Sequence, residues 1–238
     1  MNARENQIRA WTRQKPEWIP IQAGLPYLDW TAQGYEEKEL ERICQRHPVL
    51  FPNFQDGTLK RNHEMVYAQF PDLVAGKPYT DYWGSVWETK ITGMVGTVTH
   101  HALEDWENFE NFRAPDPDDN DGMRKIDWEG YQKAAASPHR DQFFFGLGGY
   151  VNFLCDMADE DPRIDKLLDI VCDFNVKLIT RFLSYKPDCI SIPEDLGMQN
   201  SPMLSVEQFR RYMAPRYERM TRPVKEAGII VHEHSDGY

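Results

Sequence analysis

The second half of the chain alternates short apolar runs with longer stretches of helical periodicity. A helix is predicted from Pro162 to about Tyr185, because Asp161 is suited to cap it and proline is favoured in a first turn. Its apolar positions recur at helical spacing, at Ile164, Leu167, Leu168, Val171, Phe174, Leu178 and Phe182. The runs FFFGLGG (143–149), CISIPED (189–195) and IIVHEHS (229–235) are predicted strands.

A further helix is predicted between the last two of these strands. Ser205 and Gln208 have the spacing of a capping box, and the pattern continues to about Gly228. Pro215 is expected to kink or restart this helix. Strands that alternate with helices indicate parallel βαβ units, so we expect an α/β domain with both faces of its sheet covered.

The first part of the chain has a different pattern. Residues 1–75 are rich in proline, aromatic and charged residues and are expected to form an N-terminal extension packed on the domain of residues 76–238. In that domain, 81–91 and 93–101 have the aromatic and β-branched content of two further strands with a glycine-containing connection.

The carboxyl ends of the last two predicted strands carry the candidate chemistry. Ligands bind at this end of the strands in parallel α/β domains. His232 and His234 should point to one side of an extended strand, with Glu233 on the other. Asp236 shares their side if the extension continues. Imidazole with carboxylate suits Zn²⁺, with Fe²⁺ or Mn²⁺ as alternatives, although the histidines could equally line a polar pocket.

Glu194 and Asp195 end the preceding strand and allow two interpretations. Either residue could cap the turn before the next helix. Alternatively, a carboxylate here could act as a third metal ligand or as a general acid or base in the same site.

Charge and composition exclude several classes of function. The formal net charge of -11 opposes binding to nucleic acid and to strongly polyanionic substrates. No apolar run is long enough for a signal peptide or a membrane span, which predicts a cytoplasmic protein with no membrane partner.

The four separated cysteines are expected to be reduced core thiols. The segment GLGGYV (146–151) does not match the dinucleotide-binding motif G-x-G-x-x-G, because Val151 stands where the motif needs its third glycine.

Several segments resemble, in order, the uroporphyrinogen decarboxylase superfamily and its methyltransferase-like branch. They are RENQIRAWTRQKPEWIP, DYWGSVWE, HHALEDWENFENFRAPDP, PDCISIPEDLGMQNSPMLSVEQFRRYMAPRYERM and VKEAGIIVHEHSDG. The combination of EDLG, the S-x-E-x-F-R helix and the HSDG end is the most specific part. The resemblance implies a (β/α)₈ TIM barrel and, in the methyltransferase branch, a zinc ion and exchange of a methyl group with a corrinoid.

The resemblance also implies a ligand set. The family's H-x-C zinc motif falls on His234, Ser235 and Asp236, and a later third ligand has no counterpart before Tyr238. Because about five of the eight strands of a barrel can be counted from residue 81, we expect an incomplete barrel. The predicted zinc ligands are His234, Asp236 and Glu194, with Glu194 and His232 as catalytic or supporting residues.

The predicted function is zinc-dependent methyl transfer between a small methyl donor or thiol acceptor and a corrinoid. No corrinoid-attachment motif of the D-x-H-x-x-G type occurs in the sequence, so the corrinoid is expected on a separate protein. Uroporphyrinogen decarboxylase activity is the alternative, disfavoured by the missing arginine-rich signature. A non-catalytic barrel fragment that acts as a binding module is the second alternative.

Overall fold

Two compact units make up the chain, and each is described here by itself. The first comprises Met1–Glu17 and Arg113–Tyr238, and the second comprises Trp18–Phe112. We call them the parallel unit and the antiparallel unit, after their sheets. The structure is a computed structural model that describes all residues except 21–29, 32, 49, 52–53, 58, 60–71, 137–144, 148–160, 236 and 238.

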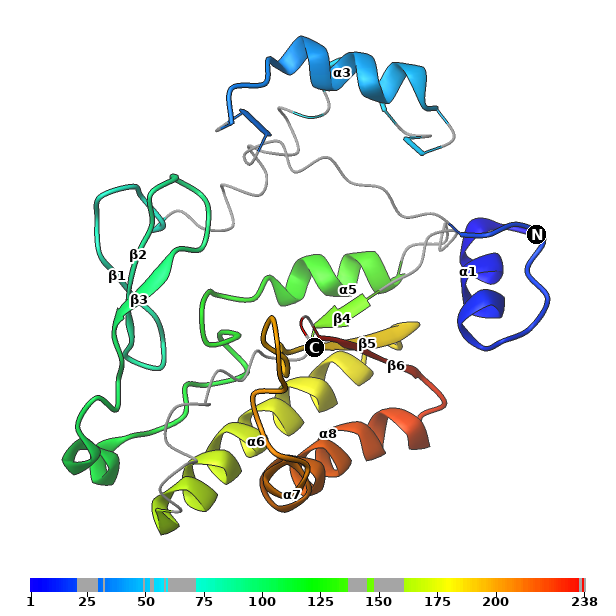
Figure 1. Ribbon diagram of the computed structural model, residues 1–238. Helices are drawn as coiled ribbons and strands as arrows, with labels where there is room; N and C mark the ends of the chain where they lie inside the picture. Colours follow the sequence, from blue (N-terminus) through cyan, green and yellow to red (C-terminus); the bar gives the residue numbers. More distant parts are fainter. Residues whose placement is uncertain are drawn as a thin grey trace. The chain divides into compact units, whose positions relative to one another are not determined.

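The parallel unit is an α/β structure, as the alternation of strands and helices predicts. Its strands are β4 (Phe145–Leu147), β5 (Cys189–Pro193) and β6 (Ile230–His234), and they pair in parallel in the order β4-β5-β6. The main helices, α6 (Pro162–Leu183) and α8 (Ala214–Glu226), pack on each other and lie along one side of this sheet (Figure 1). Within the described ranges the parallel sheet is open and has three strands, so these residues show no closed barrel.

Helix α6 begins and packs as its sequence pattern predicts. The Asp161 side chain accepts a hydrogen bond from the Arg163 amide at 2.8 Å, and Pro162 occupies the first turn. All seven apolar positions at helical spacing are buried. Arg216 of α8 adds ion pairs to Asp165 at 3.1 Å and Asp169 at 3.0 Å on α6, which tie the two helices together.

The helix predicted from Ser205 onward forms in three pieces. It comprises α7 (Val206–Gln208), a π-helical turn (Phe209–Met213) and α8. The capping box is confirmed, since the Gln208 amide donates to Ser205 Oγ at 3.1 Å. At the end of the π-helical turn, the Ala214 amide donates to the Phe209 carbonyl, which accommodates Pro215 without breaking the helix.

Helix α1 (Ala3–Trp11) belongs to the parallel unit, which differs from the predicted boundary at residue 75. The Arg4 guanidinium binds both carboxylate oxygens of buried Asp188, with Nε at 3.0 and 2.8 Å. The Trp11 ring stacks on the His232 ring with centroids 5.1 Å apart. These two contacts attach the start of the chain to strands that lie far along the sequence. Helix α5 (Trp128–Ala136) packs Trp128 against α6.

The antiparallel unit corrects one prediction. Strands β1 (Tyr79–Thr80), β2 (Val86–Glu88) and β3 (Thr97–His100) form a separate antiparallel sheet. The strands predicted in 81–91 and 93–101 therefore exist but are not barrel strands. Their short connections permit only antiparallel pairing, because a parallel crossover needs a dozen or more residues. This unit also contains the helix α3 (Glu37–Arg46) and the 3₁₀ helix η1 (Trp106–Asn111).

None of the helices in the described ranges combines the length and the apolar character needed to cross a membrane.

Asp81 organises the turn between β1 and β2, and its replacement gives a first testable prediction. Its carboxylate accepts hydrogen bonds from the amides of Trp83 at 2.9 Å and Ser85 at 2.8 Å, and from Trp87 Nε1 at 2.8 Å. We expect Asp81→Ala to destabilise the antiparallel unit by about 2 kcal/mol. Faster amide hydrogen exchange across residues 79–100 would show this loss.

The matched control is Asp81→Asn, which keeps one acceptor oxygen for the two backbone amides. It should fall between the wild type and Asp81→Ala in the same exchange measurement. Equal exchange rates in all three proteins would show that the turn does not depend on this carboxylate.

Candidate functional site

The segments that follow β5 and β6 are joined at the carboxyl edge of the parallel sheet. The Glu194 amide donates to the His234 carbonyl at 2.8 Å, and the Leu196 amide donates to Ser235 Oγ at 3.0 Å. This edge is where ligands bind in parallel α/β structures. The joined segments therefore define the candidate site.

Two glycines allow these segments to come close together. Gly237 has a φ of 93°, and a Cβ atom on it would lie 2.3 Å from the carbonyl carbon of Gly197. Any side chain at position 237 would therefore collide with backbone as well as strain the local conformation. The motifs EDLG and HSDG, far apart in the sequence, meet at this contact.

One face of the sheet carries the imidazoles. Ser191 and His232 are direct register partners on β5 and β6, and Ser191 Oγ lies 3.0 Å from Nδ1 of His232. Trp11 stacks on the same imidazole with an interplanar angle of 20°. His234 shares this face by strand alternation and is exposed.

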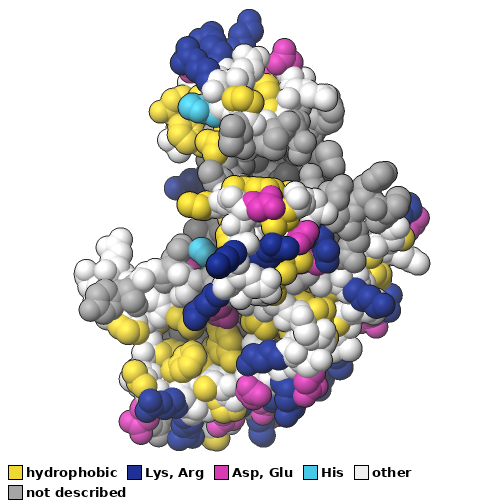
Figure 2. Space-filling view, turned by 90° about the vertical axis from the view of Figure 1, so that its right-hand side faces the viewer, with side chains coloured by type: hydrophobic (Ala, Val, Ile, Leu, Met, Phe, Trp, Pro, Cys, Tyr) yellow, Lys and Arg dark blue, Asp and Glu magenta, His cyan; other side chains and the backbone are white. Residues whose placement is uncertain are grey.

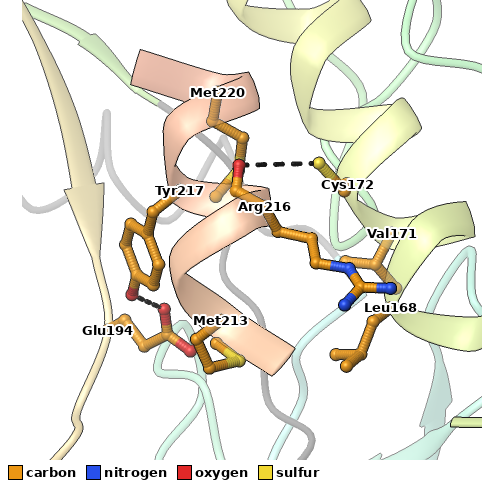
Figure 3. Close-up of a pocket in the computed structure, with 8 residues that line it drawn as sticks. All are labelled: Leu168, Val171, Cys172, Glu194, Met213, Arg216, Tyr217 and Met220. Carbon is orange, nitrogen blue, oxygen red and sulfur yellow. Dashed lines mark hydrogen bonds between the residues drawn. The ribbon is translucent and has the colours of Figure 1, made fainter. Parts of the chain in front are cut away.

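The opposite face, toward α8, carries a pair of carboxylates around one tyrosine. The Tyr217 hydroxyl donates to Glu194 Oε2 in a short hydrogen bond (Figure 3). The same hydroxyl lies 3.2 Å from Glu233 Oε1. A hydroxyl has a single proton to donate, so it cannot satisfy two charged carboxylates fully at once. The arrangement favours a proton held on one of the carboxylates.

Burial makes Glu194 an unusual acid. Glu194 is only 5% exposed to solvent. Desolvation raises its pKa to about 7, the Tyr217 hydrogen bond opposes this rise, and the charges of Glu233 and Asp195 add to it. Burial and the neighbouring Glu194 charge also raise the pKa of Tyr217, which keeps its hydroxyl protonated. Glu194 can therefore change its charge near neutral pH.

A cavity of about 20 Å³ adjoins Glu194, between α6 and α8. This volume suits a single water molecule rather than a substrate. Arg216 lines the cavity, but its guanidinium points away from Glu194 (Figure 3) and instead binds Asp165 and Asp169. The carboxylate thus has no guanidinium directed at it from this helix. The remaining lining residues are Leu168, Val171, Cys172, Met213, Tyr217 and Met220.

The structure separates Glu194 from His232. Glu194 was predicted to be a third metal ligand or a general acid or base in the same site, and its side chain lies with Tyr217 on the opposite face of the sheet. Within the described ranges, no group of three His, Cys, Asp or Glu side chains is placed to hold a metal ion. Asp236 lies outside the described residues, so the pairing of His234 with Asp236 stays a prediction.

Three neighbours of the site were not predicted. Ser191 could have been suggested by its place on the strand before Glu194, but register with His232 is not readable from one sequence. Tyr217 follows the π-helical turn, which changes the helical phase. Trp11 lies more than two hundred positions before His232, and no local pattern connects them.

Comparisons with known proteins identify a shared fold. Neither a family model nor a curated protein matches this chain. Among solved structures, a methyltransferase from Methanosarcina mazei is similar, with a TM-score of 0.53 and 13% sequence identity. The alignment covers 100% of this chain and 70% of that one. The chain therefore shares its fold with that methyltransferase.

Proposed function

We propose that this protein transfers methyl groups. The observation that carries the proposal is the pair of imidazoles, His232 and His234, on one face of β6 at the carboxyl edge of a sheet whose fold is shared with a methyltransferase. The sequence resemblance to the methyltransferase-like branch of the uroporphyrinogen decarboxylase superfamily supports the same reaction class. The proposed partners are a small methyl donor or thiol acceptor and a corrinoid carried by a separate protein.

Zinc is part of the proposal, with His234 and Asp236 as its ligands. A bound zinc ion would lower the pKa of a thiol or polarise a methoxy oxygen. A catalytic zinc site needs three protein ligands. The described residues on this face contribute His232 and His234, and Glu194 lies on the other face, so these residues alone do not complete such a site.

The placement of the two histidines suggests separate tasks. A thiol that accepts a methyl group must lose its proton, and a zinc ion held by His234 would favour this loss by stabilising the thiolate. His234 lies at the exposed edge of the sheet, where a thiol can approach it. His232 is less exposed and is held by Ser191 and Trp11, which suits it to bind rather than to shuttle protons.

Charge placement favours methyl transfer over decarboxylation of a polyanionic porphyrinogen. Such a substrate needs basic side chains gathered in one place. Arg216 and Arg219 of α8 instead form ion pairs with aspartates of α6. On the face shown in Figure 2, acidic side chains are interspersed among the Lys and Arg side chains over the lower part.

The proposal is tested with the full chain, methylcobalamin and a small thiol. We expect thiol-dependent loss of methylcobalamin absorbance, and a decrease of about 100-fold in His234→Ala. His47→Ala, in the antiparallel unit, is the matched control and should react at the wild-type rate. Absence of thiol-dependent reaction, or equal rates in wild type and His234→Ala, would contradict the proposal.

Metal analysis tests the zinc site separately. Zinc content after dialysis should fall in both His234→Ala and Asp236→Ala and remain unchanged in His47→Ala. Equal zinc content in all of the proteins would refute these ligands.

A further inference from the structure

Helix α1 gains little from apolar burial. Within the described ranges, no other helix or strand packs along its length. Its buried residues, Asn6 and Gln7, are polar, whereas Ile8, Ala10 and Trp11 are only partly buried. The burial of an apolar face is the main force that holds a helix in place. Elements that lack it open locally at a lower free energy than a packed core.

Side chains of α1 reach the sheet from both ends of the helix. Arg4 binds both carboxylate oxygens of Asp188, which directly precedes β5. Trp11 stacks on the imidazole of His232 in β6, with an angle of 20° between the rings. Because these contacts are made by side chains, α1 can leave the sheet without breaking the pairing of β5 with β6.

The Gln7 side chain favours detachment. It belongs to a residue that is only 8% exposed, and it makes no hydrogen bond with any described residue. A buried amide without a partner has lost its hydrogen bonds to water, which raises the free energy of the attached state. Detachment of the helix restores those hydrogen bonds.

We propose that residues 1–17, the N-terminal strap, detach from the sheet as one piece while its strands stay paired, and that this detachment uncovers the His232 ring. The Glu17 amide donates to Asn6 Oδ1 at 2.7 Å, and the Met1 amino group lies 3.9 Å from Glu17 Oε2. Both contacts lie within the strap and persist when it opens. Control of access to the candidate site by this opening rests on the proposed function, whereas the opening itself does not.

Native-state hydrogen exchange of the full chain in low concentrations of urea tests the opening. We expect the amides of residues 7–11 to exchange at least about tenfold faster than those of residues 171–179 in α6. Their exchange should also depend less on urea, because local opening exposes less surface than global unfolding. Equal protection and equal urea dependence in the two helices would overturn the proposal.

Two variants should shift the opening in opposite directions. Arg4→Ala should raise it by about 100-fold. Gln7→Met should lower it by about fivefold, because a side chain of similar length and helix propensity then has no amide to desolvate. Arg9→Ala, which removes an exposed ion pair with Glu5, is the control and should change it by about twofold or less. Unchanged or faster opening in Gln7→Met would contradict the role of the buried amide.

Acylation of the histidines by diethyl pyrocarbonate, read by mass spectrometry, tests whether His232 is uncovered. His234 is exposed on the same strand and serves as the internal reference. Relative to His234, modification of His232 should be faster in Arg4→Ala and slower in Gln7→Met than in the wild type. Identical ratios in the three proteins would refute the uncovering of His232.

The methylcobalamin reaction tests the control of access separately. Gln7→Met should lower kcat/KM for the thiol by about fivefold, because a smaller fraction of the protein is then open. An unchanged kcat/KM would refute the control of access. A protein that does not react at all would refute the proposed function, while hydrogen exchange and acylation would still decide whether the strap opens.

Discussion

Replacing Arg4 by alanine is expected to lower the free energy of unfolding of the parallel unit by about 3 kcal/mol. The substitution removes the guanidinium that binds both oxygens of Asp188, whose side chain is only 4% exposed. Loss of the partner of a buried carboxylate costs about this much because the remaining charge stays desolvated. Urea unfolding of the full chain, with hydrogen exchange across residues 3–11, would measure the loss.

Two variants show whether the effect comes from the buried carboxylate. Asp188→Asn in the Arg4→Ala background should recover part of the stability, because an amide carries no charge. Arg9→Ala removes an exposed ion pair to Glu5 on the same helix and should change stability by less than about 1 kcal/mol. Equal losses in Arg4→Ala and Arg9→Ala would contradict the explanation.

Glu194→Gln is expected to make the parallel unit more stable above neutral pH. The folded-state pKa of Glu194, about 7, lies above its ordinary value of 4.5. Its protonated form therefore favours the folded state, and this contribution is complete below about pH 4.5 and disappears as the pH rises through 7. The free energy of unfolding of the wild type should therefore fall by an amount on the order of 3 kcal/mol over this pH range. Glu194→Gln should not show this fall, because the amide does not ionise.

Urea unfolding at intervals from pH 5 to pH 8 would test this expectation. Tyr217→Phe should extend the loss of stability to higher pH than in the wild type, because the Tyr217 hydrogen bond lowers the Glu194 pKa and its removal leaves burial, Glu233 and Asp195 unopposed. Glu218→Gln, an exposed change on the same helix, is the control and should follow the wild-type profile. Parallel profiles for wild type and Glu194→Gln would show that Glu194 is not the group responsible.

The elements with strong local signals were predicted correctly. Helix α6 follows from a capping aspartate, a first-turn proline and a continuous apolar stripe, and all three are local properties. Strands β5 and β6 follow from short apolar runs between helices. Pro215 also marked the point where the helix changes, although the sequence does not distinguish a kink from a π-helical turn.

Contacts between segments far apart in the sequence could not be predicted from local patterns. The strands at 86–88 and 97–100 have the composition of any half-buried strand, and only the short connection between them indicates that they pair in an antiparallel sheet. Helix α1 joins the parallel unit through two contacts, one to Asp188 and one to His232, that span most of the chain. Neither contact leaves a periodic signal around Arg4 or Trp11.

The strands that carry the candidate residues could be predicted from the sequence, but the faces on which these residues lie could be predicted only within one strand. The alternation of side chains along a strand places His232 and His234 on one face of β6, and it can be applied without knowing which strands are neighbours. The face occupied by Glu194 depends instead on where β5 lies relative to β6. The register pairs Ser191 with His232 and turns Glu194 toward Tyr217. A strand-end carboxylate therefore became a buried acid under a helix rather than a neighbour of the imidazoles.

The π-helical turn before Pro215 also affects how this protein can vary in length. One residue corresponds to about 100° of rotation around a helix. A deletion of one residue within Phe209–Met213 would convert the wide turn to an ordinary one and rotate α7 relative to α8, so that either α7 or the contact of Tyr217 with Glu194, but not both, could keep its present place. Natural variants of this fold should therefore tolerate substitutions in the turn more readily than single-residue gaps.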